Sequence, residues 1–161
     1  MQRWTRFSRW DEQTVNDPAH IPGFTGLRVL VVEDEALIAL QLEDMLTESG
    51  CEIVGPASRV HQALELLGGQ QVDAAVLDLN IAGELVYPVA DALAEHGLPY
   101  IFATAYAASS LEAPYQSRLV LQKPFSRRQL LQAMQEAFQG AGKHPDSPEP
   151  DSPEPGREDS R

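Results

Sequence analysis

The sequence predicts an α/β fold in which a doubly wound, parallel sheet of five strands is flanked by five helices. Two observations support this prediction. Five short apolar runs rich in β-branched residues recur along the chain, as expected for buried strands. A segment with helical spacing of apolar residues follows each run, and this alternation favours parallel strands with right-handed crossovers and helices on both faces. The predicted strands are residues 27–32, 51–55, 72–80, 99–103 and 118–122.

The first strand and the first helix have the clearest patterns. Residues 27–32 are rich in valine and leucine, which suits a buried strand. From Leu37 to Leu46, apolar residues recur near the helical period with acidic residues between them. Gly50 follows, a residue suited to a left-handed helix cap, so the helix is expected to end there.

The next elements repeat this order. Residues 51–55 form the second predicted strand, and residues 60–67 have the apolar spacing of a helix that Gly68 is expected to stop. The third strand, residues 72–80, contains a continuous apolar run, Ala74–Leu77. Such a run suits a strand covered on both faces.

The second half of the domain is less regular. After Gly83 a third helix is predicted, in which Pro88 lies early enough to be tolerated. Residues 105–117 are rich in small residues and predict only a short, weak helix. Ser126 is a suitable N-cap for a last amphipathic helix that runs through Phe138.

Residues 27–138 therefore form the predicted domain, and the two ends have different patterns. Residues 1–26 are predicted to form an N-terminal arm, partly disordered, whose first ten residues interleave arginines with large aromatic residues. The arm either packs on its own domain or stays disordered, and the alternatives are a partner-docking helix or contact with a membrane surface. Residues 139–161 repeat the sequence Asp-Ser-Pro-Glu-Pro and predict a disordered, acidic, proline-rich tail.

Charge and cysteine content exclude several classes of protein. Residues 27–138 carry six basic and fifteen acidic side chains, so binding to nucleic acid is not expected. The single cysteine, Cys51, forms neither an internal disulfide nor a cysteine metal site. No segment approaches the ~20 apolar residues that span a bilayer. No secretory signal is apparent either, so a cytoplasmic protein without a membrane span is expected.

Polar residues follow four of the five predicted strands. In a parallel sheet, the carboxyl ends of the strands meet at one edge, where ligands bind. Each residue by itself has a structural explanation, such as a strand cap or a solvated acidic run, but their convergence indicates a site. The residues are Glu33 and Asp34 after the first strand, Asp78 after the third, Thr104 after the fourth and Lys123 after the fifth.

The chemistry of such a site follows from its charges. Crowded carboxylates repel one another, and Mg²⁺ relieves this repulsion by accepting oxygen ligands. A carboxylate oxygen can then attack a phosphoryl group and form an acyl phosphate. Lys123 and Thr104 suit contacts to the phosphoryl oxygens, while Asp78 is the carboxylate nearest the middle of the sheet.

With these residues in place, residues 27–138 resemble the receiver domain of a two-component response regulator, which has a flavodoxin-like fold. The motifs that carry the resemblance are Glu33-Asp34, Leu77-Asp78-Leu79-Asn80, Thr104-Ala105 and Lys123-Pro124-Phe125.

The resemblance implies that Asp78 accepts a phosphoryl group from a sensor histidine kinase and that Lys123 and Thr104 respond to it. It also implies a cis Lys123–Pro124 peptide bond. The implied Mg²⁺ ligands are the side chains of Glu33, Asp34 and Asp78, with Glu33 acting through water, and the main-chain carbonyl of Asn80.

Two features distinguish the chain within this family. Many receivers have an aromatic residue three positions before the lysine, and this chain has Val120. In addition, Phe102–Tyr106 is similar to the Phe-Ala-Thr-Gly-apolar-Tyr signature of a subgroup of stand-alone receivers, with Ala105 in place of glycine. That similarity makes residues 105–114 the expected mobile element.

No output domain is predicted after residue 138, so the sequence predicts a single-domain regulator that is not an enzyme. Its output is expected to be protein binding or a phosphorelay, through an unknown downstream partner. Its kinase is expected to dock beside the first helix, where Ala36 and Ala39 are predicted to be exposed. Whether the protein forms a homodimer stays open.

Two alternatives differ in class. One is a degenerate receiver that binds partners without phosphorylation. The other is a haloacid-dehalogenase-like phosphatase, which needs a second aspartate where this chain has Asn80.

Overall fold

The computed structural model describes residues 23–141 and contains a five-stranded sheet in the order β2-β1-β3-β6-β7, with all neighbouring strands parallel. This topology confirms the predicted doubly wound fold. The strands of the sheet are β1 (Arg28–Val32), β2 (Glu52–Ala57), β3 (Ala74–Leu77), β6 (Tyr100–Thr104) and β7 (Val120–Gln122). The helices are α1 (Ala36–Glu48), α2 (Val60–Gly69), α3 (Tyr87–Glu95) and α4 (Arg127–Ala141).

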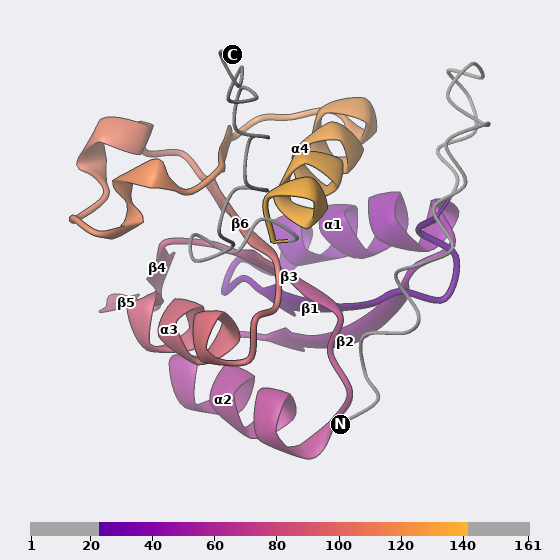
Figure 1. Cartoon of the computed structure of the whole chain (residues 1–161), viewed down its shortest axis with the longest axis horizontal. Coiled ribbons are helices and arrows are strands. Elements are labelled where there is room, and N and C mark those ends of the chain that lie inside the picture. The colour runs from indigo at the N-terminus through magenta and orange to yellow at the C-terminus, as the bar shows by residue number, and fades with distance from the viewer. Residues whose placement is uncertain (1–22, 142–161) are drawn as a thin grey trace, which may run out of the picture.

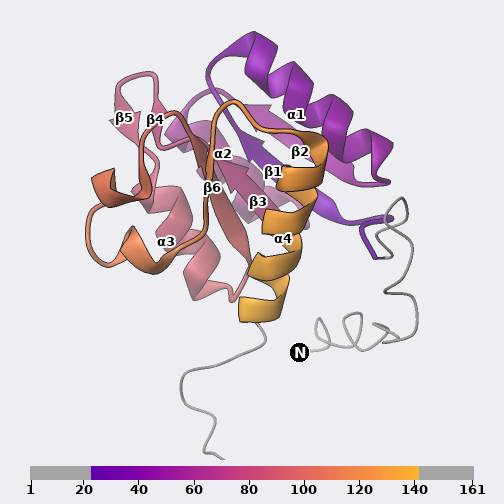
Figure 2. The same ribbon diagram turned by 90° about the horizontal axis from the view of Figure 1, so that it is seen from above.

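Two pairs of helices cover the two faces of the sheet. Helices α1 and α4 lie over one face and α2 and α3 over the other, as Figures 1 and 2 show. Strand β1 contributes to both cores, because Leu30 and Val32 pack toward α2 and α3 whereas Val29 and Val31 pack toward α1 and α4. This alternation explains why the strands are apolar throughout.

The prediction of five helices was wrong, because the described residues contain four α-helices. Residues 105–117, predicted as a short helix, form two 3₁₀ turns, Ala108–Ser110 and Tyr115–Ser117. Pro114 lacks the N–H that a continuous helix would use, and Leu111 is the buried residue of the segment. A segment with so few apolar residues cannot bury a helical face.

The outer face of α1 also differs from the prediction. Ala39, predicted to be exposed, is only 4% exposed and lies in the core, whereas Ala36 is exposed as predicted. Leu37 and Leu40, whose spacing placed them in the apolar pattern, are 80% and 54% exposed. Helix α1 has more apolar residues than one face can bury, so the side facing the sheet could not be read from spacing alone.

The ends of the domain extend slightly beyond the predicted boundaries. Phe24 is 1% exposed and its ring lies 6.3 Å from that of Phe138, so residue 24 belongs to the core. Helix α4 continues to Ala141, and Ser126 caps its start by accepting a hydrogen bond from the Gln129 N–H at 3.2 Å. The rest of the predicted arm and tail, residues 1–22 and 142–161, lies outside the described residues.

A small hairpin that the sequence did not predict follows β3. Strands β4 (Asn80–Ile81) and β5 (Glu84–Leu85) are antiparallel and joined by Ala82 and Gly83, both with positive φ, 52° and 88°. Two such residues form the tight turn whose twist matches a hairpin. The hairpin therefore lies directly after Asp78, at the carboxyl edge of the sheet.

No helix within residues 23–141 is long and apolar enough to cross a bilayer.

Candidate functional site

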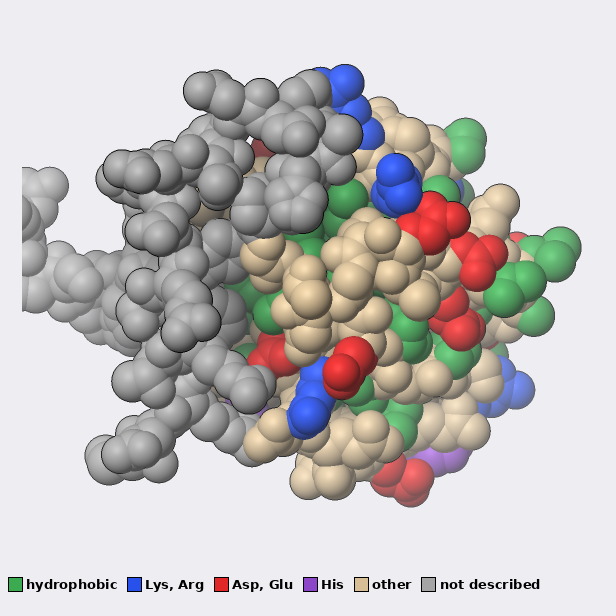
Figure 3. All heavy atoms as spheres, turned by 90° about the vertical axis from the view of Figure 1, so that its right-hand side faces the viewer, with side chains coloured by type: hydrophobic (Ala, Val, Ile, Leu, Met, Phe, Trp, Pro, Cys, Tyr) green, Lys and Arg blue, Asp and Glu red, His purple; other side chains and the backbone are tan. Residues whose placement is uncertain are grey.

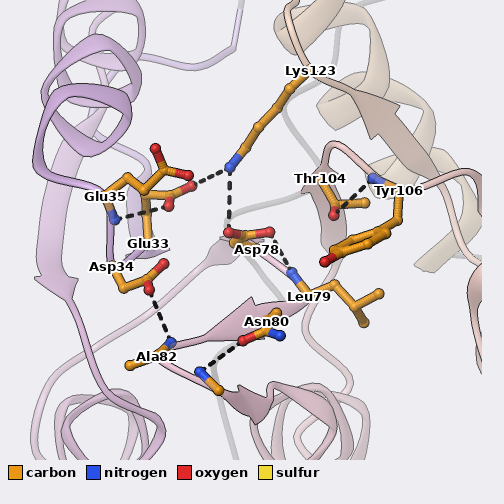
Figure 4. A network of polar contacts seen from close by, with 11 residues as sticks. Glu33, Asp34, Glu35, Asp78, Leu79, Asn80, Ala82, Thr104, Tyr106 and Lys123 are labelled. Atoms are coloured by element: carbon orange, nitrogen blue, oxygen red, sulfur yellow. Dashed lines mark hydrogen bonds and ion pairs between the residues drawn. The ribbon is translucent and has the colours of Figure 1, made fainter.

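Three carboxylates converge at the carboxyl edge of the sheet. Glu33 and Asp34 follow β1, and Asp78 follows the neighbouring strand β3. One oxygen from each of the three lies within 4.8 Å of the others (Figure 4). The structure thus brings together the acidic residues that the sequence singled out.

The same edge holds the polar side chains that are buried within residues 23–141. Among the described residues, the polar or charged side chains that are buried are Glu33, Asp78 and Thr104, with 2%, 9% and 1% exposure. Burying polar groups costs free energy unless partners compensate for it. Their concentration at one edge therefore indicates a functional site rather than a packing solution.

Lys123 provides the main compensation for the buried charges. Its Nζ donates to Glu33 Oε2 at 2.6 Å and lies 3.3 Å from Asp78 Oδ2, so one ammonium bridges two carboxylates (Figure 4). Burial lowers the pKa of Lys123, but its hydrogen bond to Glu33 and the charge of Asp78 outweigh burial, and the pKa is raised. Lys123 is therefore protonated near neutral pH.

Glu33 is the most enclosed of the carboxylates. Burial raises its pKa, although the hydrogen bonds from Lys123 and from the Glu35 N–H act in the opposite direction. The nearby charge of Asp78 adds to the increase. A carboxylate in this position benefits from any further positive charge placed beside it.

The β4–β5 hairpin holds the exposed carboxylate, Asp34. The Ala82 N–H donates to Asp34 Oδ2 at 2.9 Å, and the Gly83 N–H donates to Asn80 Oδ1 at 2.8 Å. The turn therefore orients Asp34 and also fixes the Asn80 side chain. Sequence reasoning missed Ala82, because only the paired geometry of the hairpin brings its N–H to Asp34.

Asp78 itself has one oxygen fixed and the other directed to the cluster. Its Oδ1 accepts a 2.7 Å hydrogen bond from the Leu79 N–H, while Oδ2 faces Lys123. The Asp78 main chain is held in turn, because its N–H donates to the Val32 carbonyl at 2.9 Å. Hydrogen bonds thus hold both the side chain and the main chain of Asp78, which lies near the middle of the sheet.

Thr104 lies at the predicted edge, and its hydroxyl forms a local hydrogen bond. Its Oγ1 accepts from the Tyr106 N–H at 3.3 Å. Among the described residues, no contact joins the Thr104 hydroxyl to Asp78 or Lys123. Figure 4 shows Thr104 and Tyr106 on the side of Asp78 opposite Glu33.

The donor set of this cluster fits Mg²⁺. All three side chains offer carboxylate oxygens, the ligand type that Mg²⁺ prefers. Their charge exceeds that of Lys123, so a divalent cation would relieve the remaining repulsion. Lys123 lies closer to Glu33, at 2.6 Å, than to Asp78, at 3.3 Å, and no ion pair joins it to Asp34 among the described residues, so Asp34 and then Asp78 are the more available direct ligands.

A second group of side chains holds the segment after β6. The rings of Tyr87 and Tyr115 are stacked, with centroids 4.0 Å apart, and both lie edge-on to Phe102 of β6. The Tyr115 hydroxyl donates to Asp91 Oδ1, and the Glu112 N–H donates to the Tyr87 hydroxyl. Residues 105–118 are thereby fastened to helix α3.

Val120 lies next to this group. It pairs with Phe102 in the β6–β7 ladder and packs, half-buried, against the core on the α2–α3 side. The predicted Lys123–Pro124 cis peptide is present.

Comparisons with known proteins agree on one family. Residues 29–135 match the model of the response regulator receiver domain. The transcriptional regulatory protein PdtaR of Mycobacterium tuberculosis is 34% identical over 116 residues, which cover 68% of this chain and 56% of PdtaR. The chain spans about half the length of the curated relatives it matches.

Solved structures give the same result. The solution structure of SdrG from Sphingomonas melonis Fr1 is 37% identical with a TM-score of 0.64, and the match covers 72% of this chain and 98% of SdrG. The receiver domain of the PhyR response regulator from Erythrobacter litoralis is 29% identical with a TM-score of 0.64, over 71% of this chain and 91% of that domain.

Proposed function

The chain belongs to the response regulator receiver domain family, and we propose that it accepts a phosphoryl group from a sensor histidine kinase onto Asp78. The observation that carries this proposal is the burial of polar side chains at one edge of the sheet. Glu33 and Asp78 lie there together with a bridging Lys123. An arrangement that costs stability in the resting protein is expected where it serves chemistry.

The reaction uses Asp78 as the nucleophile. One carboxylate oxygen attacks the phosphorus atom, the new O–P bond forms, and the P–N bond to the kinase histidine breaks, leaving the electron pair on the imidazole. The hydrogen bond from the Leu79 N–H orients the carboxylate, which reduces the entropy that alignment would cost. Lys123, held 3.3 Å from Asp78, is close enough to neutralise charge on the incoming phosphoryl oxygens.

The proposed Mg²⁺ ligands are Asp34 and Asp78, the main-chain carbonyl of Asn80, and Glu33 through water. Mg²⁺, when bound, supplies positive charge against the oxygens of the transferred group. Asp34 is pre-positioned for this by the Ala82 N–H.

The phosphorylated state is proposed to act through Thr104 and the segment that follows it. The Thr104 hydroxyl is held by the Tyr106 N–H, so its turning toward a phosphoryl group would release residue 106. Val120 cannot provide the ring movement of an aromatic residue at that position. The Tyr87–Tyr115 stack, which contacts Phe102 next to Val120, is the group placed to register a change in the segment.

The output is proposed to be protein binding or onward phosphate transfer in the cytoplasm, without an enzymatic activity on other substrates. The kinase is proposed to dock on the exposed part of α1, which begins two residues after Asp34 and carries the exposed residues Ala36, Leu37 and Leu40.

Incubation of the protein with acetyl phosphate and Mg²⁺ tests the proposal. We expect an acid-stable, hydroxylamine-labile phosphoryl group that EDTA prevents from forming and that Asp78→Asn lacks. Asp73→Asn is the matched control, because Asp73 lies just before β3, where it accepts a hydrogen bond from the Arg28 N–H. This control should be labelled normally.

Two outcomes would overturn the assignment. The first is labelling that persists in Asp78→Asn. The second is sustained release of phosphate from a small phosphomonoester, which would indicate a phosphatase. Asn80 argues against the second outcome, because its amide accepts a hydrogen bond from Gly83 and cannot serve as a general acid.

A further inference from the structure

The outer face of α1 carries an apolar patch that no described residue covers. Leu37 and Leu40 are 80% and 54% exposed, and they lie one turn apart on the helix. Leucine side chains with this exposure are candidates for contact with another surface. The patch belongs to the helix that borders the carboxylate cluster.

Acidic side chains continue the same face toward the end of the helix. Residues 37, 40, 44 and 48 are spaced by three or four and therefore form one stripe. Asp44 is exposed, and no ion pair within residues 23–141 includes it or Glu43. Helix α1 ends at the right-hand side of the molecule in Figure 1. Figure 3 shows this side, on which acidic side chains lie beside apolar ones. The stripe is thus apolar at its start, and toward its end it carries Asp44 and then Glu48, which already pairs with Arg127 at 2.8 Å.

The first ten residues of the chain have the complementary composition. They contain Arg3, Arg6 and Arg9, no acidic residue, and the aromatic residues Trp4, Phe7 and Trp10. Helix α1, in contrast, contains three acidic residues and no basic one. Aromatic rings suit the two leucines, and arginines suit the carboxylates.

The arm also enters the domain beside α1. Phe24 lies in the core cluster with Leu42 and Leu46 of that helix, and the Gly26 N–H donates to the Gly50 carbonyl at 2.8 Å, just past its end. The residues between 10 and 23 can span ~40 Å when extended. Helix α1 is only ~20 Å long, so the arm can reach its whole length.

We infer that residues 1–10 dock on the outer face of α1 in the same molecule, with aromatic side chains on Leu37 and Leu40 and arginines beside Glu43 and Asp44. A tether of this length gives an effective concentration near the millimolar range, so modest contacts suffice. The docking does not depend on the proposed phosphotransfer. Its consequence does: under the proposed function, the arm competes with the kinase for α1 and lowers the rate at which Asp78 is phosphorylated.

Tryptophan fluorescence tests the docking directly, because both tryptophans of the chain, Trp4 and Trp10, lie in the arm. In the full-length protein, we expect blue-shifted emission and protection from acrylamide. If about nine arms in ten are docked, Leu37→Ser with Leu40→Ser raises the quenching constant severalfold, up to about tenfold. Replacing Arg3, Arg6 and Arg9 by Gln should also raise the quenching constant. High salt should raise it as well, because salt screens the charges.

Leu64→Ser is the matched control, since Leu64 is an exposed leucine on α2, on the opposite face of the sheet. It should leave the emission unchanged. Amide hydrogen exchange of α1 gives a second readout: replacement of Trp4, Phe7 and Trp10 by Ser should increase exchange in α1 and leave α2 unaffected. Neither readout requires a kinase, so a failure of the proposed phosphotransfer does not affect them.

Four results would overturn the inference. The first is that acrylamide quenches the tryptophans as strongly as it quenches free N-acetyltryptophanamide, and the second is that Leu64→Ser changes the quenching as much as the double substitution does. The third is that protection of the tryptophans rises with protein concentration. The fourth is that this protection appears only with anionic lipid vesicles. The third would mean docking on a second copy, and the fourth would mean a membrane contact.

Discussion

The carboxylate cluster and the segment after β6 flank the same strand end but are held by different forces. At the cluster, like charges are buried and depend on Lys123. The segment 105–118 is held by stacked tyrosines and a hydrogen bond to the exposed Asp91. Charge makes the first region responsive to a cation or a phosphoryl group, whereas the contacts of the second are weak enough to rearrange. Under the proposed function, the carboxylate cluster receives the signal and the segment after β6 registers it.

The strongest test of this difference removes the ammonium. Lys123→Gln leaves Glu33 and Asp78 buried without a cation, and we expect a loss of roughly 3 kcal/mol in the free energy of unfolding. Urea denaturation without Mg²⁺ measures it. The control is Arg127→Gln, which removes an exposed ion pair to Glu48 and should cost less than about 1 kcal/mol. Equal losses of stability in the two variants would mean that the buried carboxylates depend on Lys123 no more than an exposed carboxylate depends on its ion pair.

A second test concerns the metal. Asp34→Asn keeps an oxygen for the Ala82 N–H but removes a charge, so Mg²⁺ affinity should fall by ~10–100-fold, or ~1.4–2.8 kcal/mol. Isothermal titration calorimetry measures this change. Glu84→Gln, on the same hairpin, should bind Mg²⁺ as the unsubstituted protein does, and a similar loss there would point to general surface charge instead.

The tyrosine network should respond more weakly. Tyr115→Phe removes the hydrogen bond to Asp91 while keeping the stack, and we expect a local loss below about 1 kcal/mol. Amide exchange should quicken in residues 105–118 with Mg²⁺ affinity unchanged. Asp91→Asn retains an acceptor and should have a smaller effect. Altered Mg²⁺ binding in Tyr115→Phe would show that the two regions are coupled already in the resting state.

The smallest expected effect is the pH dependence of the stability that the hydrogen bond from Tyr115 to Asp91 contributes. The hydrogen bond to Asp91, with burial, raises the pKa of Tyr115 from 10 to about 12. Because the folded-state pKa is the higher one, the stabilisation is fully present below pH 10 and is lost as the pH rises toward 12. In an ultraviolet titration that follows phenolate absorbance, Tyr115 should ionise at a higher pH than an ordinary tyrosine. Asp91→Asn should lower the pKa of Tyr115. An unchanged titration in that variant would mean that the hydrogen bond is not formed in solution.

The residues of the carboxylate cluster could be predicted because parallel strands deliver their ends to one edge. Once the strands that precede Glu33, Asp78, Thr104 and Lys123 were recognised, the convergence of these residues followed.

Other features depend on contacts distant in sequence. The stack of Tyr87 on Tyr115 joins α3 to a segment with little local pattern, so nothing near Tyr115 indicated it. The β4–β5 hairpin has strands of two residues, too short for a periodic signal. Helix α1 has more apolar residues than one face can bury, so the sequence spacing was compatible with more than one face turned toward the sheet. The exposure of Leu37 is the result.

The central claim is that Asp78 is the phosphoryl acceptor, and chemical mapping tests it most directly. Borohydride reduces an aspartyl phosphate to homoserine, so protein treated with acetyl phosphate and Mg²⁺, then reduced, carries the mark at the acceptor. We predict homoserine at residue 78 in peptide mass spectra, dependent on Mg²⁺. Homoserine at Asp34 or Asp73, or none in protein shown to carry phosphate, would contradict the claim.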